Sequence, residues 1–366
     1  MGTITQTIAN NLTTGLGADV SGINFRNIII NGDMSIAQRG TSEASVGNSF
    51  TYFTVDRFKL GGAGSSSARF TMSQDTDVPN GQGFATSLKM DCTTADASLG
   101  SSDALRISQF IEGQNLQYLK KGTANAESTT LSFWVKSNKT GTYISELRDM
   151  DNARAISKSY TIDVADTWEK KTLTFAGDTS GAFDNDNSTS LRLSNWLYAG
   201  TDYTSGTLQT SWGTLTATDR AVGQVNLADN TANEFYITGV QLEAGTSASD
   251  FEFLPYDLNL ARCERYFQFL STYTGFSLTG LSVVNGYTNF PTMRTSPSIS
   301  STNVIIVSDS VTTQFTQSSE DIIIGGDGSS ETSANIQVRN FSGLTSRRNY
   351  SVIPNSTGKI TLDSEL

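Results

Sequence analysis

The chain has 366 residues, no histidine and a formal net charge of −11. This net charge argues against nucleic acid and anionic membranes as partners, because both require a basic face. The absence of histidine excludes Ser-His-Asp and Cys-His catalysis and His-ligated metal sites, so an enzyme would have to use carboxylates, tyrosine or lysine. No apolar run reaches the ~18 residues of a membrane helix, and membrane insertion is not expected.

Residues 1–25 are polar, with aliphatic residues at every fourth position: Ile4, Ile8, Leu12 and Leu16. This spacing permits a short amphipathic helix or a stem in which three chains pack, and a flexible tail fits the sequence equally well. An arm that orders only when it docks would also have this composition. We therefore assign residues 1–25 as an N-terminal docking arm.

Residues 26–255 have the pattern of a β-sandwich. Short strands are expected at Asn27–Asn31 and Tyr52–Phe58. Alternation is clearest at Thr130–Lys136, where Leu131, Phe133 and Val135 share one face and Trp134 lies on the other. Strands separated by Gly, Asn and Asp turns, in a chain with 32 glycines and few helix formers, predict a β-sandwich or jelly-roll domain.

A helix is expected after Pro255, where the sandwich pattern ends. Asp257 can cap it, and an apolar stripe continues to Leu270, so we assign residues 256–271 as a linker helix. Residues 272–366 again show short strands and polar turns. The fold class is therefore all-β, with a jelly-roll domain, a short helix and a second, smaller β-sandwich domain. Cys92 and Cys263 lie far apart in the sequence, and two buried thiols are expected.

Several motifs in register, from residue 27 to about residue 300, carry a family resemblance. They include Asn27–Thr41 (NIIINGDMSIAQRGT), Val55–Phe58 (VDRF), Leu131–Ser137 (LSFWVKS), Gly239–Glu243 (GVQLE), Phe251–Glu252 (FE), Arg262–Phe267 (RCERYF) and Phe290–Pro297 (FPTMRTSP). This series resembles a jelly-roll domain of bacteriophage tail fibres and appendages, especially of phages that infect marine bacteria and cyanobacteria. The resemblance implies a homotrimeric virion component with a carbohydrate-binding-module-like sandwich. In such a protein residues 1–25 would attach to other virion proteins of the tail, neck or head.

Three functions are compatible with this resemblance. The first is a non-enzymatic fibre or appendage component that recognises a host surface polysaccharide, with weak binding multiplied over several chains. The second is a purely structural adaptor, neck or head-decoration protein. The third is a polysaccharide depolymerase, which would need two facing carboxylates. The glutamates available for that role are Glu112, Glu169, Glu234 and Glu243.

Glycan binding requires aromatic faces, and the candidate residues are Trp134, Trp168, Trp196, Tyr198, Tyr203 and Trp212. Among these we favour the cluster of Trp196, Tyr198, Tyr203 and Trp212 as the ligand-binding residues. They lie in a stretch rich in Gly, Ser and Thr that is typical of loops, and loops on a rigid sandwich commonly carry binding sites. The alternative is that these aromatics pack the sandwich or a subunit contact. Trp134, in a clean strand, is interpreted as structural.

Acidic and amide residues between Asp178 and Asn187 could hold Ca²⁺, which prefers oxygen ligands. Asp184 and Asp186 have the alternate spacing of a calcium loop, but the glycine and final glutamate of an EF-hand are missing. A polar turn is the alternative, and no other cofactor is expected.

Overall fold

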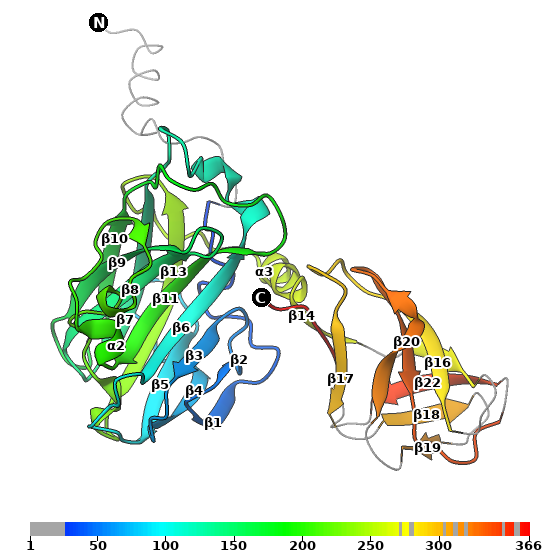
Figure 1. The fold of residues 1–366 in the computed structure, drawn as a ribbon. Coiled ribbons are helices and arrows are strands. Elements are labelled where there is room, and N and C mark those ends of the chain that lie inside the picture. Colours follow the sequence, from blue (N-terminus) through cyan, green and yellow to red (C-terminus); the bar gives the residue numbers. More distant parts are fainter. Residues whose placement is uncertain are drawn as a thin grey trace, which may run out of the picture. The chain divides into compact units, whose positions relative to one another are not determined.

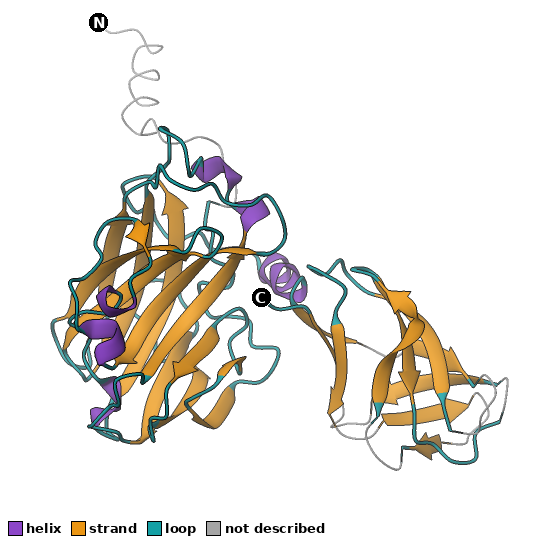
Figure 2. Ribbon diagram, viewed as in Figure 1, coloured by secondary structure: helices purple, strands orange, loops and turns teal. Residues whose placement is uncertain are grey.

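A computed structural model describes residues 26–270, 273–277, 282–302, 305–309, 314–317, 321–345, 348–354 and 359–366. The predicted docking arm lies outside these residues. The regular secondary structure of the described chain is mostly strand, with few and short helices, so the prediction of an all-β fold is confirmed (Figure 2). It divides into two compact units. The first comprises the described residues up to Ser35, Thr41–Thr54 and Phe58–Phe253, and the second comprises Ile36–Gly40, Val55–Arg57 and Leu254–Leu366.

The first unit is a jelly-roll sandwich of two antiparallel sheets, here called sheet A and sheet B (Figure 1). Sheet A has the strand order β1 (Ser42–Val46), β4 (Arg69–Asp75), β5 (Ser87–Thr94), β13 (Glu234–Ala244), β7 (Thr129–Ser137) and β10 (Glu169–Phe175). Sheet B has the order β12 (Gly213–Thr214), β9 (Arg154–Ile162), β8 (Gly141–Asp149), β11 (Thr189–Ala199), β6 (Ala104–Glu112), β3 (Lys59–Ala63) and β2 (Phe50–Tyr52).

Alternation along the strands directs one face of each sheet into the core between them. In β7 the buried residues Leu131, Phe133 and Val135 alternate with Trp134 and Lys136, which are partly exposed. The predicted strand and its faces are therefore confirmed. Sheet B differs, because β6 is buried along its whole length and alternation of burial is lost. The short helices of this unit are η1 (Gly113–Asn115), η2 (Gln117–Leu119), α2 (Thr201–Thr204), η3 (Ala217–Asp219) and η4 (Leu227–Asp229).

Two predicted strands near the start of this region are wrong. Ile28, Ile29 and Ile30 are buried as expected, but the segment belongs to no sheet. The Asn27 side chain holds it instead, because its amide donates to the Val240 carbonyl and its oxygen accepts from the Ile29 and Leu242 amides. The predicted strand Tyr52–Phe58 ends at Tyr52, and the next strand, β3, begins only at Lys59.

The C-terminal part of the second unit contains α3 (Tyr256–Glu264) and two further antiparallel sheets. The predicted helix is confirmed but shorter than expected, because residues 267–270 form a strand. The three-stranded sheet has the order β14 (Phe267–Leu270), β23 (Lys359–Asp363) and β17 (Ser298–Thr302). The seven-stranded sheet has the order β19 (Gln314–Thr316), β18 (Ile305–Asp309), β22 (Asn349–Pro354), β15 (Tyr273–Phe276), β16 (Val284–Asn289), β21 (Ser333–Val338) and β20 (Ile322–Ser329).

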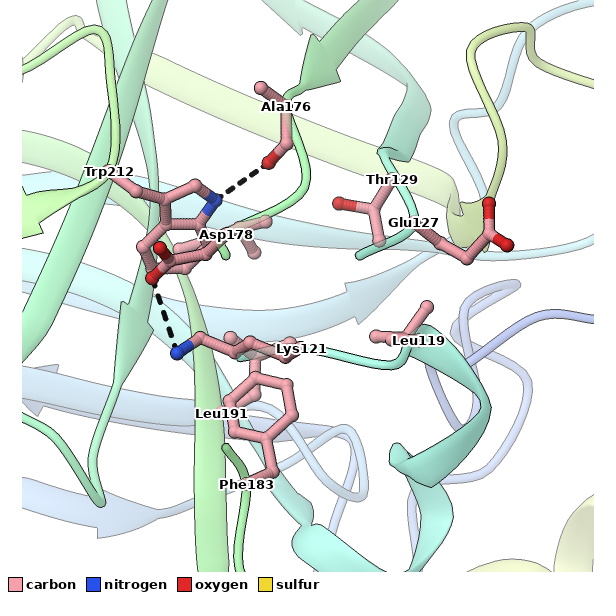
Figure 3. Close-up of a pocket in the computed structure, with 10 residues that line it drawn as sticks. Leu119, Lys121, Glu127, Thr129, Ala176, Asp178, Phe183, Leu191 and Trp212 are labelled. Carbon is pink, nitrogen blue, oxygen red and sulfur yellow. Dashed lines mark hydrogen bonds and ion pairs between the residues drawn. The ribbon is translucent and has the colours of Figure 1, made fainter. Parts of the chain in front are cut away.

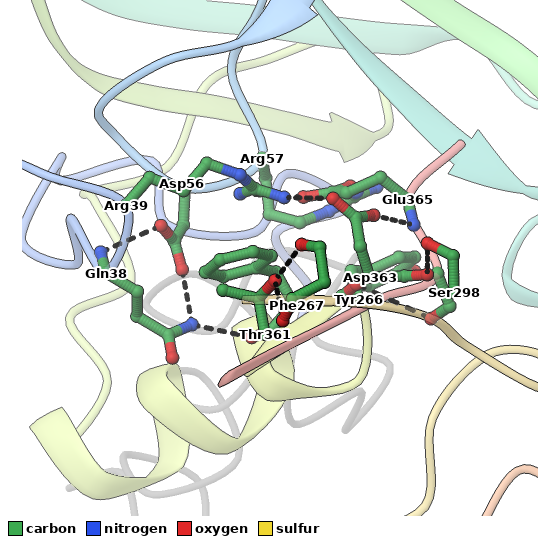
Figure 4. Close-up of polar contacts among 12 residues, drawn as sticks. Gln38, Arg39, Asp56, Arg57, Tyr266, Phe267, Ser298, Thr361, Asp363 and Glu365 are labelled. Atoms are coloured by element: carbon green, nitrogen blue, oxygen red, sulfur yellow. Dashed lines mark hydrogen bonds and ion pairs between the residues drawn. The ribbon is translucent and has the colours of Figure 1, made fainter. Parts of the chain in front are cut away.

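Two short segments from the first sixty residues are integral parts of this second unit (Figure 4). The Gln38 backbone N–H and side-chain amide donate to the Asp56 carboxylate at 3.0 and 2.5 Å, and the same amide donates to the Phe267 carbonyl at 2.8 Å. Arg57 forms an ion pair with Glu365, and its guanidinium carbon lies 3.4 Å from the centre of the Tyr266 ring. Burial raises the pKa of Asp56 to about 6, although the bonds from Gln38 and the nearby Arg39 act in the opposite direction.

Both cysteines are free and buried, as the sequence predicts. Burial raises the pKa of the Cys92 thiol to about 11 and that of Cys263 well above its usual range. Neither thiol therefore has the lowered pKa of a reactive cysteine. Among the described residues, the helices are all too short or too polar to span a bilayer.

Candidate functional site

An open groove of about 330 Å³ lies on the outer face of sheet A. Ligand pockets in proteins commonly measure about 300–1,000 Å³, so this groove is at the small end of that range. Its walls come from the middle of the sheet and from two loops that lie beside it. The lining residues are Gly81, Gln82, Phe84, Ser132, Trp134, Lys170, Gly239, Asp250, Phe251 and Phe253.

Trp134 forms the sheet side of the groove. Its register places it between Lys170 of β10 and Thr238 of β13, on the face opposite the buried Phe133. The indole is partly exposed. Among the residues that the structure describes, none accepts a hydrogen bond from its N–H and no aromatic ring stacks on it. The ring face and the donor are therefore both available to a ligand.

Three phenylalanines form an aromatic wall of the groove. The ring centres of Phe84, Phe251 and Phe253 lie 4.9–5.1 Å apart in every pair, and Phe253 is 50% exposed. Gly239 makes this wall possible, because it has a φ of +61° and a Cβ there would lie 2.6 Å from the tip of the Phe84 ring. Only glycine satisfies both conditions at low cost.

Uncommitted polar groups line the rest of the groove. Lys170 and Asp250 are exposed, and within the described part of the chain neither the Lys170 ammonium nor the Asp250 carboxylate has an ion-pair partner. Gln82 and Ser132 add an amide and a hydroxyl. Aromatic faces next to free hydrogen-bonding groups suit a sugar ring, whose C–H faces are apolar and whose hydroxyls both donate and accept. A single carboxylate lines the groove, whereas hydrolysis of a glycosidic bond requires two.

For two of the predicted ligand-binding aromatics, the structure differs from the predicted exposed loop. Trp196 and Tyr198 lie in β11, not in a loop, and both side chains are completely buried. Tyr198 stacks on Phe70 with ring centres 6.4 Å apart, in the core of the sandwich. Neither aromatic face is accessible to a glycan, so the alternative of packing applies to both.

The other two predicted aromatics lie apart from each other. Tyr203, in α2, packs on Trp196 with ring centres 5.4 Å apart. Trp212 lines a different pocket together with Lys121, Asp178 and Phe183, and its indole donates to the Ala176 carbonyl at 2.7 Å (Figure 3). This second pocket measures about 20 Å³, which is room for about one water molecule. The four residues therefore form no common site.

The predicted cation ligands Asp184 and Asp186 lie in an exposed loop between β10 and β11. The Asp186 carboxylate accepts the Ser188 backbone N–H at 2.9 Å, which is the geometry of a polar turn. Across the described residues, no three His, Cys, Asp or Glu side chains come together as metal ligands. The structure therefore adds no support for the calcium site.

The four glutamates considered for hydrolysis are each engaged elsewhere, and none lines the groove. Glu112 accepts from Gln114, Glu169 from Lys171, Glu234 from Lys89 and Glu243 from Ser249.

Sequence reasoning missed the groove, although part of the signal was present. Alternation correctly placed Trp134 opposite Phe133, but Trp134 was interpreted as structural. The motifs Leu131–Ser137, Gly239–Glu243 and Phe251–Glu252, which are distant in sequence, each supply a lining residue. Their convergence could have been suspected only from their shared membership of one motif series.

Comparisons with known proteins give matches of structure only. No family model matches the sequence, and no curated protein matches it. Among solved structures, the enzymatically active domain of tailspike protein 4 from bacteriophage CBA120 is similar with 16% identity and a TM-score of 0.31, over 60% of this chain and 22% of that chain. A CBM4 structure matches with 13% identity and a TM-score of 0.30, over 58% of this chain and 97% of its own.

A third neighbour is the module TmCBM61 in complex with β-1,4-galactotriose, with 9% identity and a TM-score of 0.30 over 60% of this chain and 99% of its own. The structural neighbours thus include a phage tailspike domain and carbohydrate-binding modules. At these TM-scores they assign no function.

Proposed function

We propose that the protein is a virion fibre or appendage component that binds a host surface glycan in the groove over Trp134 and does not cleave it. The observation that carries this proposal is the uncommitted indole of Trp134 beside the uncommitted charges of Lys170 and Asp250. The resemblance of the motif series to phage appendages supports the virion assignment. It also supports a homotrimer, in which weak sites would act together.

The groove is suited to modest affinity. Its volume of about 330 Å³ admits one or two sugar rings, and Phe253 at its rim is half exposed. Small contact areas give weak binding unless several copies act together. A trimer on a particle surface would provide such copies, which makes a shallow groove adequate for attachment.

The test is binding of the purified protein to host cells and to their extracted surface polysaccharide, with reducing ends assayed in the same samples. We expect Trp134→Ala to abolish binding. Trp168→Ala is the matched control, because Trp168 directly precedes β10 of sheet A but donates to Asp77 at 2.9 Å and packs on Tyr236. We expect the control to retain binding and to lose at least as much thermal stability.

Each other outcome selects a different function. Release of reducing ends would show a depolymerase, and the single carboxylate of the groove would then not be the site of chemistry. Equal loss of binding in both variants would remove the groove as the binding site. Absence of binding by the wild-type protein would favour the structural adaptor, with Phe253 and other exposed aromatics serving assembly contacts.

A further inference from the structure

The outer face of sheet B carries a cluster of four arginines around one glutamate. Register places Arg106 of β6 opposite Trp196 of β11, and Arg192 of β11 opposite Arg148 of β8. Glu146 precedes Arg148 by two residues and therefore lies on the same face. Arg220, which follows η3, completes the cluster. Figure 1 shows β6, β8 and β11 side by side in this sheet.

One carboxylate cannot neutralise this cluster. Glu146 is completely buried and accepts two hydrogen bonds from Arg220, at 2.6 and 2.8 Å. Arg192 reaches the same carboxylate only at 3.4 Å. Arg106 and Arg148 form no ion pair with any described residue. The group therefore holds an excess of positive charge in a protein whose net charge is −11.

Other charged groups nearby do not remove this excess. The Lys59 ammonium lies 5.1 Å from the centre of the Phe110 ring and adds a further positive charge. Glu112, two residues beyond Phe110 in β6, accepts a hydrogen bond from Gln114 at 2.6 Å. Including both residues, five basic side chains on this face accompany two carboxylates.

Several donors of the cluster are buried without an acceptor. They are the Nε atoms of Arg106, Arg148 and Arg192 and the Nε1 of Trp196. Arg106 is 9% exposed and Arg192 3% exposed, so bulk solvent has little access to either guanidinium. Arg192 has only the 3.4 Å contact with Glu146, and Arg106 lies over the Trp196 ring, 5.2 Å from its centre, without a carboxylate, so little negative charge offsets either buried cation. Water can accept from these donors but cannot offset their charge.

The pKa values agree with this geometry. Burial, together with repulsion from neighbouring arginines, lowers the pKa of Arg106 to about 10 and that of Arg192 to about 9. Burial likewise lowers the pKa of Arg148. Glu146 behaves in the opposite way, because Arg220, Arg192 and Arg106 outweigh the effect of its burial and hold its pKa near 2. A second negative charge would be stabilised by the same field.

We propose that this arginine cluster binds a small oxyanion, such as sulfate, phosphate or the carboxylate of an acidic sugar. Guanidinium groups bind such anions through paired N–H donors, and the cluster supplies several donors that no protein group uses. Arg148 is only half-buried and is the most accessible arginine of the cluster, whereas Trp196 is completely buried. The site is separate from the groove over Trp134 and does not depend on its function.

The test uses the full-length protein and inorganic sulfate. We expect millimolar sulfate to raise the melting temperature in a saturable manner beyond sodium chloride of equal ionic strength, because a ligand of the folded state stabilises it. Isothermal titration should show heat of binding. Glucuronate, tested in parallel, distinguishes a site for a free ion from a site that also accepts a carboxylate borne on a sugar.

Two variants give opposite expected results. Arg106→Gln should weaken sulfate binding about tenfold or more, because it removes a charged donor. Glu146→Gln should strengthen binding, because it removes the competing carboxylate. Arg154→Gln is the control, since Arg154 lies in β9 of the same sheet but is fully engaged with Asp178 at 2.7 and 3.0 Å, and it should leave sulfate affinity unchanged.

The proposal would be overturned by equal melting temperatures in sulfate and in matched chloride with no heat of sulfate binding. It would also be overturned if Arg106→Gln bound sulfate as tightly as the wild-type protein. If Glu146→Gln does not fold, the sulfate affinities of Arg106→Gln and Arg154→Gln still decide whether the arginine cluster binds the anion.

Discussion

The outer faces of the two jelly-roll sheets are built on the same alternation but are covered differently. On sheet A, β10 alternates between partly buried and exposed residues, and the face leaves Trp134 and Lys170 accessible. On sheet B, β6 and the interior of β11 are buried throughout, and Tyr203 of α2 packs on Trp196. On a covered face such as that of sheet B, polar residues become buried and need partners. On an uncovered face such as that of sheet A, polar residues can stay solvated and available to a ligand.

The largest expected effect comes from removing the charge at the centre of the covered face. Glu146→Ala leaves Arg220 and Arg192 without their carboxylate and should lower the free energy of unfolding by about 3–5 kcal/mol. Urea unfolding at pH 7 measures this. Glu127→Ala is the control, because its ion pair with Lys120 is exposed and should contribute about 0–1 kcal/mol. Similar losses in the two variants would contradict the comparison of covered and uncovered charges.

A second test asks whether the number of cations decides how a buried carboxylate titrates. Asp56 has a pKa of about 6 because burial dominates, whereas Glu146 is held near 2. A raised pKa gives stability that is complete below about pH 4 and lost as the pH rises through 6. The wild-type protein should therefore lose on the order of 3 kcal/mol relative to Asp56→Asn between pH 4 and pH 7.

Glu146 should show the opposite sign, because its pKa is depressed. Its stabilisation is present above about pH 4.5 and is lost as the pH falls toward 2. Unfolding of wild type, Asp56→Asn and Glu146→Gln at several pH values isolates the two contributions by difference. A parallel pH profile for the wild type and Asp56→Asn would contradict the assignment of the raised pKa.

A third test concerns the wall of the uncovered face. Gly239→Ala should cost about 1–3 kcal/mol, because it combines backbone strain with displacement of Phe84, and it should also weaken glycan binding. Gly81→Ala separates these causes, since Gly81 has a φ of +74° and nothing within 4 Å of the added Cβ. It should cost about 1 kcal/mol or less. Equal losses of unfolding free energy in Gly239→Ala and Gly81→Ala would show that backbone strain alone accounts for the effect at Gly239.

The smallest expected effect is that of an exposed aromatic ring. Phe253→Ala should reduce glycan affinity by about 0.5–1.5 kcal/mol, the contribution of one aromatic contact, with little change in stability. Phe50→Ala provides a matched control, because Phe50 is 49% exposed, as Phe253 is 50% exposed, but belongs to β2 of sheet B. We expect Phe50→Ala to leave the glycan affinity unchanged. Equal losses of affinity would show that the groove is not the binding surface.

The sequence predicts strands best where one face is open to solvent. The alternation at Thr130–Lys136 corresponds to β7, with the predicted residues inward. The segment around Trp196 and Tyr198 was assigned to a loop because it is rich in Gly, Ser and Thr. It is the end of β11, where Trp196, Leu197 and Tyr198 are all apolar and a register shift lies between Trp196 and Tyr198, so alternation between apolar and polar residues gives no signal there.

Neither candidate site can be predicted from local sequence patterns. The groove requires Trp134 and Phe251 to lie close together, and the arginine cluster joins residues of three strands with Arg220 from a connecting segment. Spacing along the chain contains no information on these contacts, because they depend on strand order and register. The motif series marks the segments of the groove without showing what each contributes.

The discontinuity of the second unit has a consequence for how the protein is made. Gln38 forms its hydrogen bond with Phe267, which is synthesised 229 residues later, and Arg57 pairs with Glu365, which is synthesised 308 residues later. On the ribosome these early segments remain without their partners while the whole jelly roll is synthesised. A gene fragment encoding residues 254–366 would lack them altogether. Dissection of this protein at the apparent boundary should therefore yield a poorly folding C-terminal piece, unless residues 36–57 are supplied with it.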